Sequence, residues 1–95
     1  MSAVNLAEVH SSVTDRGLDA TATIARLRAM GMQVVPFDER DAQVVGALRP
    51  RTRELGLSLA DRACLALGLR LGRPVLATDK ALADADVGVD VILVR

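Results

Sequence analysis

Residues 58–79 read SLADRACLALGLRLGRPVLATD, and this stretch decides the fold. Ser58 is a helix-capping residue, and it predicts an apolar helix over residues 59–71 that stops at Gly72. Residues 74–78 then read as a compact apolar strand. A strand with apolar residues at successive positions is typical of a parallel sheet that is covered on both faces. The stretch therefore predicts an α/β domain.

The remaining elements expected from the sequence are further helices and strands on either side of this stretch. Helices are expected where a capping residue precedes an apolar stripe at helical spacing, and strands where short apolar runs lie between turn residues. In chain order they are helices over residues 3–13, 19–30, 40–48 and 80–85, with strands over residues 32–37 and 89–94. Pro50 is expected to interrupt the helix that starts at Arg40, with helical structure resuming to Leu55.

Composition limits the classes of protein to which the chain can belong. Its 95 residues are enough for one small domain, expected over residues 1–95. Twelve basic and twelve acidic residues cancel, so any contact with nucleic acid must come from a local patch. Phe37 is the single aromatic residue and Cys64 the single cysteine, which disfavours base stacking and excludes an internal disulfide. Neither a membrane span nor a signal peptide is recognisable, so a cytoplasmic protein is expected.

Asp61, in the first turn of the apolar helix, admits two interpretations. Arg62 and Arg70 are expected to mark the solvent side of that helix, so Asp61 would face inward or into a cleft. Residues 58–61 also match a capping box, in which the Asp61 side chain only satisfies the start of the helix. The sequence leaves both interpretations open.

Two further carboxylates have settings that favour a functional role. Glu8 lies in the middle of the first expected helix, in a polar row with Asn5 and Ser12. Asp79 follows the carboxyl end of an apolar strand, where parallel α/β sheets place their ligands. Carboxylates that gather repel one another, and a hard divalent cation bound through oxygen relieves that repulsion. Both acids also have a structural interpretation, Asp79 as a helix cap and Glu8 as a solvated residue.

Several segments resemble one known family. Residues 57–67, LSLADRACLAL, resemble the signature of VapC-like PIN domains, in which an Asp follows a Ser-Leu pair at the start of an apolar helix. Residues 74–80, PVLATDK, are similar to the family's strand that ends in Thr-x-Asp or a close variant. Residues 2–9, SAVNLAEV, resemble its helix with a metal-binding Glu, and residues 89–95, VDVILVR, resemble its closing strand. The resemblance spans nearly the whole chain and keeps the order of the motifs.

The resemblance implies a three-layer α/β/α sandwich with three parallel strands in this chain. It also implies a ribonuclease dependent on Mg²⁺ or Mn²⁺, usually the toxin of a toxin–antitoxin pair. The implied metal ligands are Glu8, Asp61 and Asp79, with Thr78 and Asn5 as supporting residues. Thr78 stands directly before Asp79, whereas many relatives have the Thr one residue earlier. The implied partners are an RNA substrate, a cognate antitoxin and a second copy of the chain.

The resemblance departs from the family pattern at the N-terminus. Full-length relatives begin with a strand that ends in a metal-binding Asp and lies in the middle of the sheet. This chain starts at the Glu helix, so an N-terminally truncated PIN domain is expected, with a misassigned start codon or a truncated gene as its origin. Each backbone group left unpaired by a missing strand costs roughly 1–3 kcal/mol. The alternatives are a catalytically impaired remnant that only binds antitoxin or dimerises, and an unrelated α/β domain whose three acids are helix caps.

Basic residues alternate around Pro50. Arg49, Arg51 and Arg53 form a candidate patch for RNA phosphates or for an acidic antitoxin segment. A solvated turn between helices explains the same residues equally well. His10 is the single histidine, so the chain cannot form a histidine-based catalytic triad, and a surface position is expected for it.

Overall fold

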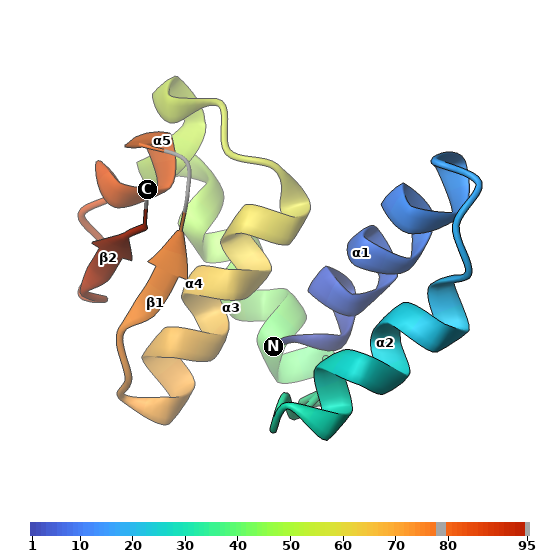
Figure 1. Ribbon diagram of the computed structural model, residues 1–95. Helices are drawn as coiled ribbons and strands as arrows, with labels where there is room; N and C mark the ends of the chain where they lie inside the picture. Colours follow the sequence, from blue (N-terminus) through green and yellow to red (C-terminus); the bar gives the residue numbers. More distant parts are fainter. Residues whose placement is uncertain (78–79, 95) are drawn as a thin grey trace. The chain divides into compact units, whose positions relative to one another are not determined.

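The computed structural model describes residues 1–77 and 80–94 (Figure 1). Contacts between residues divide the chain into two compact units, Met1–Phe37 and Asp38–Arg95. The units contain α-helices and a small parallel sheet of two strands, so the chain has the mixed α/β fold expected from its sequence. None of the helices in the described part of the chain has the length and apolar character that a membrane span requires.

The first unit is a pair of packed helices, α1 (Ala3–Asp15) and α2 (Ala20–Ala29). The Ser2 hydroxyl caps α1 by accepting the N–H of Val4, and the Asp19 carboxylate caps α2 in the same manner through the N–H of Ala22. Serine and aspartate are both preferred at the residue that precedes a helix.

Residues 32–37, expected as a strand, form a single β-bridge in which Val35 pairs in parallel with Ser2. The Ala3 N–H donates to the Val35 carbonyl at 2.9 Å. Because α1 begins at Ala3, the partner segment leaves the extended conformation directly after the bridge. The pairing therefore does not continue past Ser2.

The second unit is arranged around α4 (Leu59–Leu71), which packs against α3 (Glu39–Thr52) and against β1 (Val75–Ala77). Leu65, at the centre of α4, has none of its surface exposed. Gly72 ends the helix in the left-handed conformation with φ of 61°, which glycine adopts without steric cost. The beginning and the end of α4 are those expected from the sequence.

The sheet pairs β1 in parallel with β2 (Val91–Leu93), and α5 (Lys80–Ala83) lies in the connection between them (Figure 1). One face of β1 contacts α4, and Val75 on this face is buried. On the opposite face Leu76 is 67% exposed, and its partner in register, Ile92, is 50% exposed. Within this unit, the expectation of cover on both faces therefore holds for one face only.

Pro50 does not interrupt α3, so that expectation was wrong. The helix continues through Pro50 to Thr52 and is followed by a short 3₁₀ helix, η1 (Arg53–Leu55). Proline removes the N–H that would bond to the carbonyl of Gly46, four residues earlier. Gly46 is exposed, so water can satisfy that carbonyl and the last turn of the helix tolerates the proline.

Arg62 is not on the solvent side of α4, contrary to expectation. It is only 8% exposed, and its Nη1 donates to the carbonyl of Val45 in α3 at 3.1 Å. A guanidinium on a long apolar stem can enter a helix–helix contact when a carbonyl there accepts its hydrogen bond. Arg70 does lie on the exposed side, where its Nη1 is 3.3 Å from Asp41 Oδ2.

The close approach of α4 and β1 at Gly68 yields a test of the packing. A Cβ atom at this position would lie 2.9 Å from Val75 Cγ2 and 3.0 Å from Val89 Cγ1. We expect Gly68→Ala to lower the free energy of unfolding by about 1–3 kcal/mol, because the added methyl group overpacks the contact. Gly46→Ala in α3 is the matched control, since no atom lies within 4 Å of its added Cβ. It should raise the free energy of unfolding by about 0.5–1 kcal/mol through helix propensity. Urea unfolding followed by circular dichroism measures both, and equal effects would contradict the packing.

Candidate functional site

Asp61 occupies the third position of α4 and closes a capping box with Ser58. The Ser58 N–H donates to Asp61 Oδ2 at 3.0 Å, and the Asp61 N–H donates to Ser58 Oγ at 3.1 Å. The capping box expected from the sequence is therefore present. The box does not use the whole carboxylate, which has about four acceptor positions. Among the described residues only Oδ2 accepts a hydrogen bond.

A second capping box stands at the start of α3 and has the same geometry. The Asp38 N–H donates to Asp41 Oδ2 at 3.1 Å, and the Asp41 N–H donates to Asp38 Oδ1 at 3.0 Å. The backbone N–H of Asp41 is the main cause that lowers the pKa of Asp38. Asp41 itself is buried, and the guanidinium of Arg70 contacts the same Oδ2. The negative charge of Asp41 is therefore balanced inside the fold.

Asp61 differs from Asp41 in its charge environment. It is half-buried, and no Arg or Lys nitrogen in residues 1–77 and 80–94 lies within ion-pair distance of its carboxylate. Its negative charge is therefore not balanced by this part of the chain. A carboxylate held in one orientation, with one oxygen unused, is a suitable ligand for a hard divalent cation.

The other predicted site residues fall in different parts of the structure. Glu8 and Asn5 lie on α1 in the first unit, where Glu8 is exposed and Asn5 is half-buried. Thr78 and Asp79 lie outside the described residues. Because Glu8 and Asp61 belong to different units, no distance between them is defined. No three His, Cys, Asp or Glu side chains of the described residues group as a metal site, and the expected three-carboxylate cluster stays a prediction.

Cys64 follows Asp61 on α4 at a distance of about one helical turn and is half-buried. Burial raises the pKa of the Cys64 thiol, and the negative charge of Asp61 raises it further. A thiol with a raised pKa stays protonated near neutral pH and is a poor nucleophile. His10 is exposed on α1, as expected. The Cys64 thiol is therefore a poor candidate for a nucleophile, and His10 lies in a different unit from Asp61.

The three arginines of the predicted basic patch are exposed but not equivalent. Arg51 Nη2 donates to the carbonyl of Asp86 at 2.9 Å, which ties this guanidinium to the loop before β2. The guanidinium groups of Arg49 and Arg53 make no hydrogen bond or ion pair with any described residue. Their spacing of four residues places them on one side of the helical segment. Two of the three guanidinium groups are thus available to a ligand.

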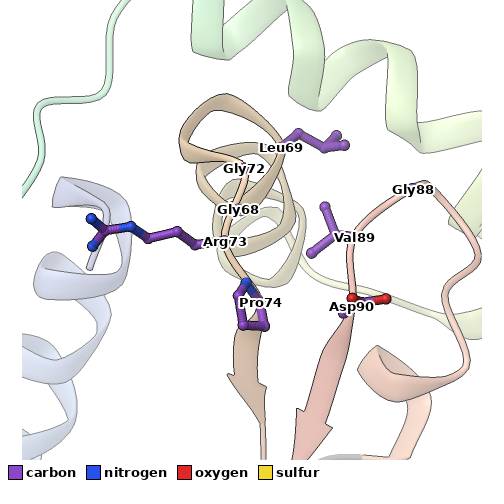
Figure 2. A pocket seen from close by; sticks show the side chains of 8 residues that line it. All are labelled: Gly68, Leu69, Gly72, Arg73, Pro74, Gly88, Val89 and Asp90. Atoms are coloured by element: carbon purple, nitrogen blue, oxygen red, sulfur yellow. The ribbon is translucent and has the colours of Figure 1, made fainter.

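A small pocket lies in the second unit, at the amino end of β1 (Figure 2). Its walls come from the last turns of α4 and from the loop before β2. The lining residues are Gly68, Leu69, Gly72, Arg73, Pro74, Gly88, Val89 and Asp90. Parallel α/β sheets hold their ligands at the carboxyl ends of the strands, so this pocket is not our candidate site.

The charge of Asp61 can be measured through Cys64. We expect Asp61→Asn to lower the pKa of the thiol, because removing a nearby negative charge stabilises the thiolate. The rate of alkylation by iodoacetamide as a function of pH should shift to lower pH. Asp41→Asn, which removes the acid of the other capping box, should leave the profile unchanged. An unchanged profile in Asp61→Asn would show that the Asp61 charge does not act on Cys64.

Comparison with protein-family models matches the PIN domain over residues 1–88. Comparison with curated proteins and with solved structures found no match. The matched segment includes α1 with Glu8, the capping box of Asp61 and the motif that ends at Asp79. It covers most of the 95 residues, and the chain belongs to the PIN domain family.

Proposed function

We propose that the chain is a metal-dependent endoribonuclease of the VapC type, the toxin of a toxin–antitoxin pair that acts in the cytoplasm. Membership of the PIN family supports the general part of this proposal, because PIN domains are nucleases that act on nucleic acid. PIN domains also generally use divalent metal ions. The motifs of the sequence support the finer part, since they resemble those of VapC-like members.

One observation carries the proposal, and it is the uncompensated carboxylate of Asp61 at the start of α4. Asp41 shows what an acid with a purely structural role looks like at the same position of a capping box, since it is buried and paired with Arg70. Asp61 has the same hydrogen bonds without a cationic partner among the described residues. A divalent cation would supply the missing positive charge.

In the proposed site, the carboxylates of Glu8, Asp61 and Asp79 hold Mg²⁺ or Mn²⁺, with Thr78 and Asn5 as supporting groups. The chemistry of this donor set fits the preference of both ions for oxygen ligands. A bound ion would polarise a phosphodiester and activate water at neutral pH. The contribution of α4 is to keep Asp61 in one orientation through the Ser58 capping box. The proposal takes residues 1–95 as a single functional domain.

RNA binding is proposed to rely on phosphate contacts. The chain has zero formal charge and one aromatic residue, so neither global attraction nor base stacking is available. Arg49 and Arg53 supply two guanidinium groups that no described residue pairs with. The family often has partner proteins, and a cognate antitoxin and a second copy of the chain are the partners that we propose.

Neutralising the proposed ligands tests the function directly. We expect Asp61→Asn and Asp79→Asn each to lower the rate of RNA cleavage by at least about 100-fold, exceeding the 10–100-fold effect typical of outer-shell residues. The measurement is cleavage of a fluorescently quenched RNA at saturating Mg²⁺ or Mn²⁺. Cleavage that survives in the double variant would contradict the proposal.

Asp41→Asn is the matched control for this experiment. It neutralises the acid at the equivalent position of α3 and removes the contact with Arg70. It should lower the free energy of unfolding by about 1 kcal/mol and leave cleavage unchanged.

Wild-type protein that binds no Mn²⁺ saturably at millimolar concentration would support the alternative of a PIN domain without catalytic activity.

The arginines can be tested separately from the carboxylates. We expect the double variant Arg49→Gln/Arg53→Gln to weaken RNA binding and to reduce the slope of log affinity against log salt by roughly 1 for each phosphate that is no longer neutralised. Arg51→Gln is the control, since Arg51 already donates to Asp86, and it should have the smaller effect. Fluorescence anisotropy with a labelled RNA at several salt concentrations gives both values. Unchanged RNA binding in the double variant would leave the antitoxin as the ligand of this patch.

A further inference from the structure

The two capping boxes of the second unit have the same backbone pattern and different chemistry at the residue that opens the helix. In α3 the side chain of Asp38 accepts the N–H of the acid at the third position, and in α4 the hydroxyl of Ser58 does so. In both boxes the N–H of the opening residue donates to Oδ2 of the acid. Each acid is therefore bound to its own helix start by two hydrogen bonds.

The two acids differ in their burial and in the further contacts of their carboxylates. Asp41 Oδ2 accepts a second donor, Arg70 Nη1 at 3.3 Å, and the residue is buried. Asp61 is half-buried, and in the described part of the chain its Oδ1 accepts no hydrogen bond. The hydrogen bond from the Ser58 N–H thus fixes Asp61 Oδ2. The orientation of Oδ1 follows from this bond, because no other described residue holds Oδ1.

We propose that Ser58 is a positioning residue for Asp61 as a metal ligand. Its N–H holds Oδ2, its hydroxyl holds the Asp61 N–H, and Asp61 Oδ1 is thereby presented to a divalent cation in a single orientation. This inference rests on the proposed function and adds to it the residue that orders the ligand. A ligand whose rotamer is fixed in advance loses less conformational freedom on binding, and hydrogen bonds to a metal-binding carboxylate are a common means of fixing it.

The test is the affinity of the full chain for Mn²⁺, measured by isothermal titration calorimetry without RNA. We expect Ser58→Ala to bind Mn²⁺ about 10-fold more weakly, the size of effect typical of outer-shell groups. The change removes the acceptor of the Asp61 N–H, so the helix start that directs the Ser58 N–H at Asp61 Oδ2 is no longer fixed. Ser58→Thr keeps a hydroxyl at the helix start and should bind Mn²⁺ with nearly wild-type affinity. Recovery by Thr separates a positioning role from a simple loss of side-chain volume.

Asp38→Ala is the matched control, because it removes the same kind of capping group from α3. It should lower the midpoint of thermal unfolding about as much as Ser58→Ala and leave the affinity for Mn²⁺ unchanged. If Ser58→Ala does not fold, Ser58→Gly takes its place, since glycine is well tolerated at a helix start and also lacks the hydroxyl.

The possible outcomes separate this inference from the proposed function. Wild-type affinity in Ser58→Ala or Ser58→Gly would overturn the role of Ser58 and leave the proposed function standing. An equal loss of affinity in Asp38→Ala would also overturn it, since the effect would then come from general destabilisation. Wild-type protein that binds no Mn²⁺ would overturn the proposed function and this inference with it.

Discussion

The pair of reciprocal hydrogen bonds between Ser58 and Asp61 determines where α4 begins, and the second unit is arranged around that helix. Within that helix, the spacing of 3.6 residues per turn separates the side chains that face α3 from those that face β1. Arg62 then reaches the Val45 carbonyl of α3, and Gly68 presents a surface without a side chain to the strand. A rotation of the helix by one residue position, about 100°, would break both interactions.

The parts of the fold that depend on neighbouring residues were predictable. The helix starts at Ser2, Asp19, Asp38 and Ser58 follow from capping chemistry, which acts over three or four positions of the chain. The burial of Arg62 was not predictable, because it requires a carbonyl of α3 as its acceptor. Helical spacing places a residue on a side of its helix without saying what that side contacts. The continuation of α3 through Pro50 likewise depends on the exposure of the carbonyl that loses its partner.

The candidate site was likewise predictable where it depends on neighbouring residues, and not where it depends on contacts between distant ones. Sequence reasoning singled out Asp61 and treated the cap and the metal ligand as alternatives, whereas the hydrogen bonds of the cap leave one oxygen unused. It missed Asp41, although residues 38–41 have the same spacing between capping residue and acid as residues 58–61. What distinguishes the two acids is Arg70, which is 29 positions from Asp41 in the chain and close to it in space. Glu8 and Asp79 stay predictions, and a local pattern cannot show whether they meet.

The hydrogen bonds of the Ser58 box have a consequence for the proposed metal site. In zinc fingers the ion completes the fold, and the empty chain is unstructured. Here the first turn of α4 is complete without an ion, because the side-chain oxygens of Ser58 and Asp61 already accept its backbone N–H groups. Folding would then not require that the proposed site be loaded, although a cation that binds only the native chain would still stabilise it.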